Sequence, residues 1–166
     1  SCALFGPHKI EDNKEELFLS DFKSDGCSAF PNGHLLSSKS EWLHCCFVHD
    51  LSYWYGGSRD QKIYADKELN ECVSEVTTQT QGELMEIGVE VGGSPQSGLP
   101  WRWGYGWNIE VPYMEIDGDK VEKMKKKFSS VSPEFERWKE KLSPAQRFYI
   151  KEKIAETKEA LFSTEH

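Results

Sequence analysis

The sequence predicts a mainly α fold in which two antiparallel helices are followed by additional C-terminal helices. Capping boxes at Ser38 and Ser58 each begin a segment with helical spacing of apolar residues. Only the Gly-Gly-Ser turn at 56–58 separates these segments, and so short a connection makes two helices antiparallel neighbours. A third capping signal, Ser143 followed by Pro144, predicts a helix in the C-terminal part.

The length and composition bound the class of protein. A chain of 166 residues has the size of one domain, 1–166, with a helical hairpin at about 38–81 and a C-terminal extension at about 101–166. The net charge of −8 provides no basic excess to displace counterions, which excludes nucleic acid as the main partner. No apolar run approaches the roughly 20 residues that cross a bilayer.

The two helices of the hairpin have predicted ends. Residues 1–37 show no sustained period, and the first helix follows the box Ser38-Lys39-Ser40-Glu41. It ends at about Tyr55, because two glycines follow and adopt a left-handed conformation at little cost. The second helix follows the box Ser58-Arg59-Asp60-Gln61. Its expected residues include Ile63, Asp66, Leu69, Asn70 and Val73.

Beyond the hairpin, the stretch from Gly92 to Pro100 is a break. Four rings then alternate with other residues over 101–107, and period two predicts an extended segment with all four on one face. Such a stripe is more often core packing; the alternative is an aromatic patch at the level of lipid headgroups. From about Asp119 the chain is charged and predicted to be helical.

Five cysteines leave two interpretations open. One is a pair of disulfides with one thiol left over, which indicates an oxidising compartment. The other is an intracellular zinc site made by Cys45, Cys46, His49 and Cys72. The spacing fits no common zinc knuckle, so disulfides are favoured. The cysteines are Cys2, Cys27, Cys45, Cys46 and Cys72.

The first helix carries a pair of residues suited to catalysis. His49 and Asp50 project about 100° apart on a helix, so the two side chains lie beside each other. Asp66 on the second helix is the natural partner for the far nitrogen of His49, because a carboxylate there fixes the tautomer and stabilises the imidazolium. Tyr53, one turn after His49, is placed to bond the same carboxylate.

These residues form a known pattern: CC-x-x-HD, a tyrosine four residues after the histidine, then a helix with Asp66 and, six residues on, Cys72. The pattern resembles the secreted calcium-dependent phospholipase A(2) family. The likeness extends upstream to Asp25-Gly26-Cys27-Ser28, at the place of the family's calcium loop, and covers about Asp25 to Val73. The sparse cysteines point to a microbial-type branch.

The resemblance implies roles for individual residues. His49 would be the general base, with Asp66 orienting it and Tyr53 in support. Asp50 would bind Ca²⁺ together with backbone carbonyls. The carbonyl ligands would belong to Gly26, Ser28 and Phe30. The disulfides would be Cys27–Cys46 and Cys45–Cys72. The loop has fewer glycines than is typical of the family, although carbonyl ligands depend on the backbone path rather than on a side chain.

The resemblance also implies a function. We expect calcium-dependent hydrolysis of the sn-2 acyl ester of glycerophospholipids by a histidine-activated water, at a phospholipid membrane surface or micelle. No G-x-S-x-G motif offers a serine nucleophile instead. The expected location is secreted or periplasmic, with Cys2 as a candidate lipid anchor. The alternative is a catalytically silent lipid-binding or toxin-like module on the same fold.

Overall fold

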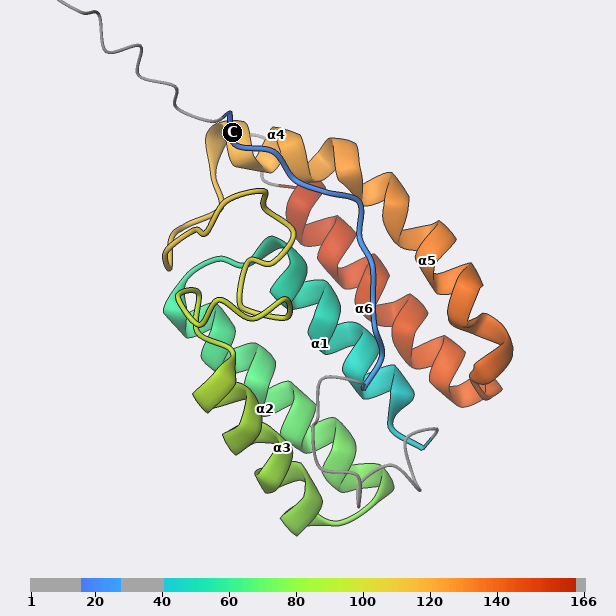
Figure 1. Ribbon diagram of the computed structural model, residues 1–166. Helices are drawn as coiled ribbons and strands as arrows, with labels where there is room; N and C mark the ends of the chain where they lie inside the picture. The colour runs from blue at the N-terminus through green and yellow to red at the C-terminus, as the bar shows by residue number, and fades with distance from the viewer. Residues whose placement is uncertain (1–15, 28–40, 164–166) are drawn as a thin grey trace, which may run out of the picture.

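The computed structural model describes residues 16–27 and 41–163, and these residues are mainly helical, as predicted (Figure 1). The only pairing of strand type among them is an isolated antiparallel bridge between Leu19 and Trp107. The helices are α1 (Leu43–Tyr55), α2 (Arg59–Val76), α3 (Gln79–Gly92), α4 (Gly118–Lys127), α5 (Val131–Trp138) and α6 (Pro144–Phe162), with short 3-10 turns at Phe128–Ser130 and Lys139–Lys141.

Helices α1 and α2 form the predicted antiparallel hairpin (Figure 1). Gly56 and Gly57 both have positive φ, 68° and 135°, which allows the chain to reverse within three residues. The Ser58 hydroxyl then accepts from the Gln61 amide at 3.2 Å, and the Gln61 side chain accepts from the Ser58 amide at 2.8 Å. This capping box is confirmed.

The predicted start of the first helix is wrong. Helix α1 begins at Leu43, and its N-cap residue Trp42 makes no side-chain capping bond. Ser38 lies outside the described residues. Instead, the Trp42 ring is buried and its carbonyl accepts from the amide of Cys45 at 2.9 Å. Tertiary packing of the tryptophan therefore sets the start of α1, and no polar capping side chain contributes.

Helix α3 is an element that the sequence pattern did not predict. The Thr78 side chain caps it, and the helix packs along α2 (Figure 1). It buries Met85 and Val89. The signal was ambiguous because the apolar residues at 85, 87, 89 and 91 also alternate with the period of a strand.

The aromatic stretch at 101–107 is a series of turns, so the predicted extended segment with four rings on one face is wrong. Gly104 has a positive φ of 80°, which breaks the alternation. The core interpretation is correct for Trp103 and Trp107, which are 1% and 2% exposed. Their indole N–H groups donate to carbonyls at the turn between α1 and α2: Trp103 to Gly57 at 2.9 Å and Trp107 to Tyr55 at 3.0 Å.

Replacing Trp103 by alanine should lower the free energy of unfolding by about 3–5 kcal/mol, because it removes a fully buried ring and its hydrogen bond. Urea denaturation measures the change. Trp101→Ala is the matched control, since that ring is only half-buried and its loss should cost less. Equal losses in the two variants would contradict the assignment of Trp103 to the core.

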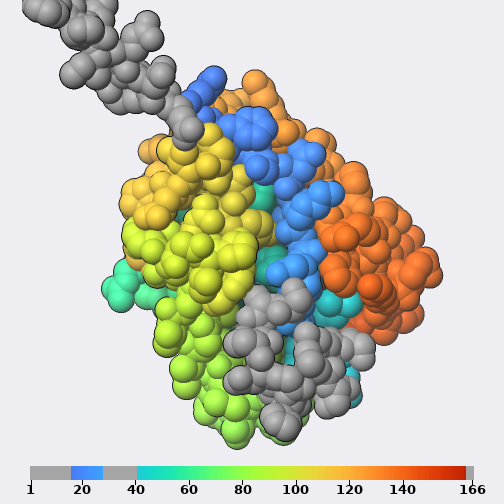
Figure 2. Space-filling view, viewed as in Figure 1, coloured from blue at the N-terminus to red at the C-terminus, as the bar shows by residue number. Residues whose placement is uncertain are grey.

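The C-terminal helices cover the other side of α1. Phe47 of α1 packs edge-on against Phe135 of α5, and Ile150 of α6 is fully buried in the same core cluster. Residues 16–27 run in the seam between these helices and the loops after α3 (Figure 2). The predicted capping box at Ser143 with Pro144 is confirmed at the start of α6. That residues 1–166 form a single domain stays a prediction.

Candidate active site

Helices α1 and α2 bring His49 and Asp66 into contact. Their side chains are 8% and 1% exposed, and His49 Nε2 lies 2.9 Å from Asp66 Oδ1. The disulfide Cys45–Cys72 joins the same two helices, with Cys45 one turn before His49. A second disulfide, Cys27–Cys46, ties α1 to the segment before it. The structure thus has the pairing that the resemblance implies, and it cross-links α1 beside the candidate site.

Both carboxylate oxygens of Asp66 are occupied by further donors. The Tyr53 hydroxyl donates to Oδ1 at 2.6 Å, and the Lys62 ammonium donates to Oδ2 at 2.8 Å. Burial alone would raise the pKa of Asp66, but the hydrogen bonds from His49, Lys62 and Tyr53 outweigh it and hold that pKa below its usual value. Asp66 is therefore an ionised carboxylate in a buried network.

Lys62 is a member of this network that sequence reasoning missed. It is 4% exposed, and its ammonium also donates to the Val89 carbonyl of α3 at 3.3 Å. The available signal was its position four residues before Asp66 on the same helix, where side chains lie one above the other. A lysine on a charged helix is more often solvated, so spacing alone did not single it out.

The arrangement assigns different roles to the two ring nitrogens of His49. An ionised carboxylate only accepts hydrogen bonds, so the nitrogen facing Asp66, Nε2, carries the proton. The other nitrogen, Nδ1, is then the basic one and can accept a proton from water. Burial and the charge of Asp66 raise the pKa of Tyr53, so its hydroxyl stays protonated and remains a donor.

Asp50 lies next to a second acidic residue that the sequence reasoning did not select. The Ser24 hydroxyl donates to Asp50 Oδ2 at 2.7 Å. Burial, followed by the charge of Asp25, raises the pKa of Asp50 well above its ordinary value. The signal for Asp25 was present, since it directly precedes Gly26 in the candidate calcium loop.

The donor set at Asp50 fits a hard divalent cation. Two neighbouring carboxyl groups repel each other when both are ionised, and a calcium ion relieves that repulsion through oxygen ligands. Gly26 has a positive φ of 65°, and a Cβ there would crowd Leu43 and Trp138. Ser28 and Phe30 lie outside the described residues, so their predicted carbonyl ligands stay a prediction.

His49 and Asp50 face different hollows among those lined by described residues. His49 lines a small gap with Ser52, Leu69 and Tyr149. Asp50 lines an open pocket of about 610 Å³. Successive helical residues project about 100° apart, which accounts for the separation. Within 16–27 and 41–163, the structure brings His49, Asp66 and Tyr53 together and places Asp50 beside them, on a neighbouring face of α1.

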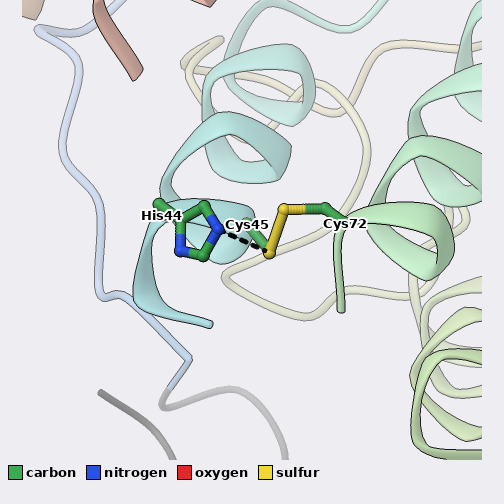
Figure 3. Close-up of side chains that lie close together, drawn as sticks. All are labelled: His44, Cys45 and Cys72. Atoms are coloured by element: carbon green, nitrogen blue, oxygen red, sulfur yellow. Dashed lines mark hydrogen bonds between the residues drawn. A yellow bond between two sulfur atoms is a disulfide. The ribbon is translucent and has the colours of Figure 1, made fainter. Parts of the chain in front are cut away.

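A histidine and two cysteines form a second cluster on the hairpin, shown in Figure 3. His44 Nε2 lies 3.5 Å from Cys45 Sγ, but Cys45 and Cys72 are bonded to each other. Because the thiolate is the form of cysteine that binds a metal, these sulfurs are not ligands in this state. Cys46 is also in a disulfide, so the intracellular zinc interpretation is wrong for this structure.

The disulfides predict the result of a thiol titration. Four of the five cysteines are paired, and the fifth, Cys2, lies outside the described residues. Titration of the unreduced, denatured protein with a thiol reagent should therefore detect no more than one thiol per chain: one if Cys2 is unmodified and none if it carries a lipid. Five reactive thiols would indicate reduced cysteines and restore the metal-site interpretation.

Comparison with known proteins adds no relative: no protein-family model, curated protein or solved structure matches the chain. Among the described residues, no helix combines the length and apolar character that crossing a membrane requires.

Proposed function

We propose that the protein hydrolyses the sn-2 acyl ester of glycerophospholipids with the help of calcium, as a phospholipase A(2)-type enzyme of a microbial branch. The observation that carries the proposal is the buried His49–Asp66 contact at 2.9 Å. The next residue after His49 is Asp50, whose carboxyl group lies beside that of Asp25. The family motif quoted above supports the same chemistry.

Each residue of the site has a separate role in the proposed reaction. Nδ1 of His49 takes a proton from the attacking water, and Asp66 stabilises the imidazolium that results. Tyr53 and Lys62 hold Asp66 in place and keep it ionised. Asp50 and Asp25 would hold the calcium ion, with Gly26, Ser28 and Phe30 as the carbonyl ligands that the resemblance implies. When bound, the ion supplies positive charge for the oxygen of the ester carbonyl.

The disulfides support the proposed compartment. Disulfides persist where the surroundings are oxidising, so the bonds Cys27–Cys46 and Cys45–Cys72 support a secreted or periplasmic location. The substrate would then be met as a phospholipid membrane surface or micelle. Lipidation of Cys2, which lies outside the described residues, is part of the same proposal, and the intact mass of the native protein tests it.

A turnover assay tests the proposal directly. The protein is expected to release the sn-2 fatty acid from phosphatidylcholine in mixed micelles when calcium is present, and to stop when a chelator is added. Restored turnover after calcium is added back shows that the chelator did not unfold the protein. Fatty-acid release that is unchanged by chelator, or absent with calcium, would refute the proposed reaction.

A catalytically silent lipid-binding or toxin-like module is the alternative, and its lipid-binding part is supported by an exposed apolar face. Helix α3 exposes an apolar face at Leu84, Ile87 and Val91, with Val91 80% exposed. An amphipathic helix of this kind suits contact with a lipid surface whether or not turnover follows. Vesicle binding by a protein that releases no fatty acid under any calcium condition would favour this alternative.

A further inference from the structure

The pocket beside Asp50 carries charges of both signs. It has a volume of about 610 Å³ and lies between the segment before α1, the turns after α3, and α5. The carboxyl groups of Asp25 and Asp50 belong to its lining, as do the cationic side chains of Lys23 and Arg137. Rings of Trp101 and Trp138 complete the wall. We call this the Arg137 pocket.

A buried carboxylate organises the cationic wall of the Arg137 pocket. Glu134 of α5 is 2% exposed, and its Oε1 accepts from Arg137 Nε at 2.8 Å and from Trp138 Nε1 at 3.0 Å. Its Oε2 has Lys23 Nζ at 3.7 Å. Burial alone would raise the pKa of Glu134, but the bonds from Arg137 and Trp138 reverse the direction, so the carboxylate stays charged. One buried group therefore holds Arg137 and Trp138 by hydrogen bonds and has Lys23 within ion-pair distance.

The two cations keep donors available to a ligand. Arg137 Nη2 donates to the Ser24 carbonyl at 3.1 Å and also to Glu134, whereas Nη1 makes no hydrogen bond with any described residue. The side chains of Arg137 and Lys23 are 56% and 74% exposed, so their charged ends reach solvent in the pocket. A guanidinium fixed at Nε and Nη2 presents its remaining nitrogen in a set direction.

The charge balance identifies the kind of ligand. A divalent cation held by Asp25 and Asp50 would compensate these two carboxylates. Lys23 and Arg137 share the single negative charge of Glu134, so they leave a net charge of +1 to attract an anion. Guanidinium groups match phosphate oxygens in geometry and charge. We propose that the Arg137 pocket binds the phosphodiester of the glycerophospholipid headgroup, with Arg137 as the main phosphate ligand and Lys23 as a second. This inference rests on the proposed function.

The test measures binding, so that it does not depend on turnover. Isothermal titration uses the His49→Gln protein with calcium, which cannot consume the ligand by the proposed mechanism. Monomeric dihexanoyl phosphatidylcholine is the first probe; dihexanoylglycerol, which lacks the phosphate, is the second; inorganic phosphate is the third. Adding Arg137→Gln should raise the Kd for the phospholipid by about tenfold or more and leave the Kd for dihexanoylglycerol within about twofold.

Two further variants serve as a second test of the pocket and as a control outside it. Lys23→Gln changes an exposed side chain, so it leaves the fold intact even if Arg137→Gln does not, and it should weaken phospholipid binding about threefold. Arg59→Gln, an exposed arginine at the start of α2 and outside the pocket, should change nothing.

Three outcomes would overturn the assignment. Equal weakening of phospholipid and dihexanoylglycerol would show that Arg137 only supports the fold. If neither Arg137→Gln nor Lys23→Gln weakens phospholipid binding, the phosphate group does not bind in this pocket. Arg137-dependent binding of inorganic phosphate as tight as that of the phospholipid would make it a site for free phosphate. Failure of the proposed hydrolysis shows up separately, in the fatty-acid assay on the unmodified protein.

Discussion

Replacing His49 by glutamine is expected to lower calcium-dependent fatty-acid release by about a thousandfold or more. Glutamine has a similar length and can still donate to Asp66, so the buried carboxylate keeps a partner. It has no basic nitrogen to accept the proton of water, and that loss falls on the chemical step. The rate constant kcat on monomeric dihexanoyl phosphatidylcholine measures the effect.

The same helix offers a matched control. His44 is buried to a similar degree, 6% exposed against 8% for His49, and it contacts Tyr149 edge-on rather than Asp66. His44→Gln should keep activity within a few-fold of the unmodified protein. Thermal unfolding of both variants shows whether either has lost its fold. If His49→Gln retains more than about a tenth of the activity, or if His44→Gln loses as much, His49 is not the general base.

Much of the hairpin could be predicted because its signals are local. The box at Ser58, the two glycines before it and the offset from His49 to Asp66 are all set by short-range geometry, and the structure reproduces them. The pairing of cysteines was implied by the family pattern alone, since spacing left a metal site open. The structure joins Cys45 to Cys72 and Cys27 to Cys46.

What could not be predicted depends on contacts between distant segments. The start of α1 is fixed by burial of Trp42, and Trp103 and Trp107 lie in the core because their indoles reach carbonyls at the end of the hairpin. Likewise, Lys62 becomes part of the site only because α3 covers it and supplies the Val89 carbonyl. No periodicity within one element records such a contact.

Removing the charge of Asp50 is expected to have the second large effect. Asp50→Asn should abolish the calcium dependence of fatty-acid release and lower activity by more than about 100-fold, because losing a group that only supports a metal ligand already costs up to about 100-fold and Asp50 would bind the ion directly. The substitution is nearly isosteric, and the amide oxygen can still accept from Ser24. Asp25→Asn, at an exposed position, should weaken calcium binding less. Isothermal titration calorimetry with calcium measures the Kd of each variant and shows which substitution weakens binding more.

Thermal stability with and without calcium shows whether Asp50 binds the metal or only stabilises the fold. Because burial and Asp25 raise the pKa of Asp50, the folded protein binds that proton more tightly than the unfolded chain. Without calcium, stability therefore falls as the pH rises from the ordinary pKa towards the raised one, and bound calcium reverses the loss. In chelator at pH 8, Asp50→Asn should have a Tm at least equal to that of the unmodified protein, and calcium should no longer raise it. A variant that is less stable in chelator and still stabilised by calcium would place the ion elsewhere.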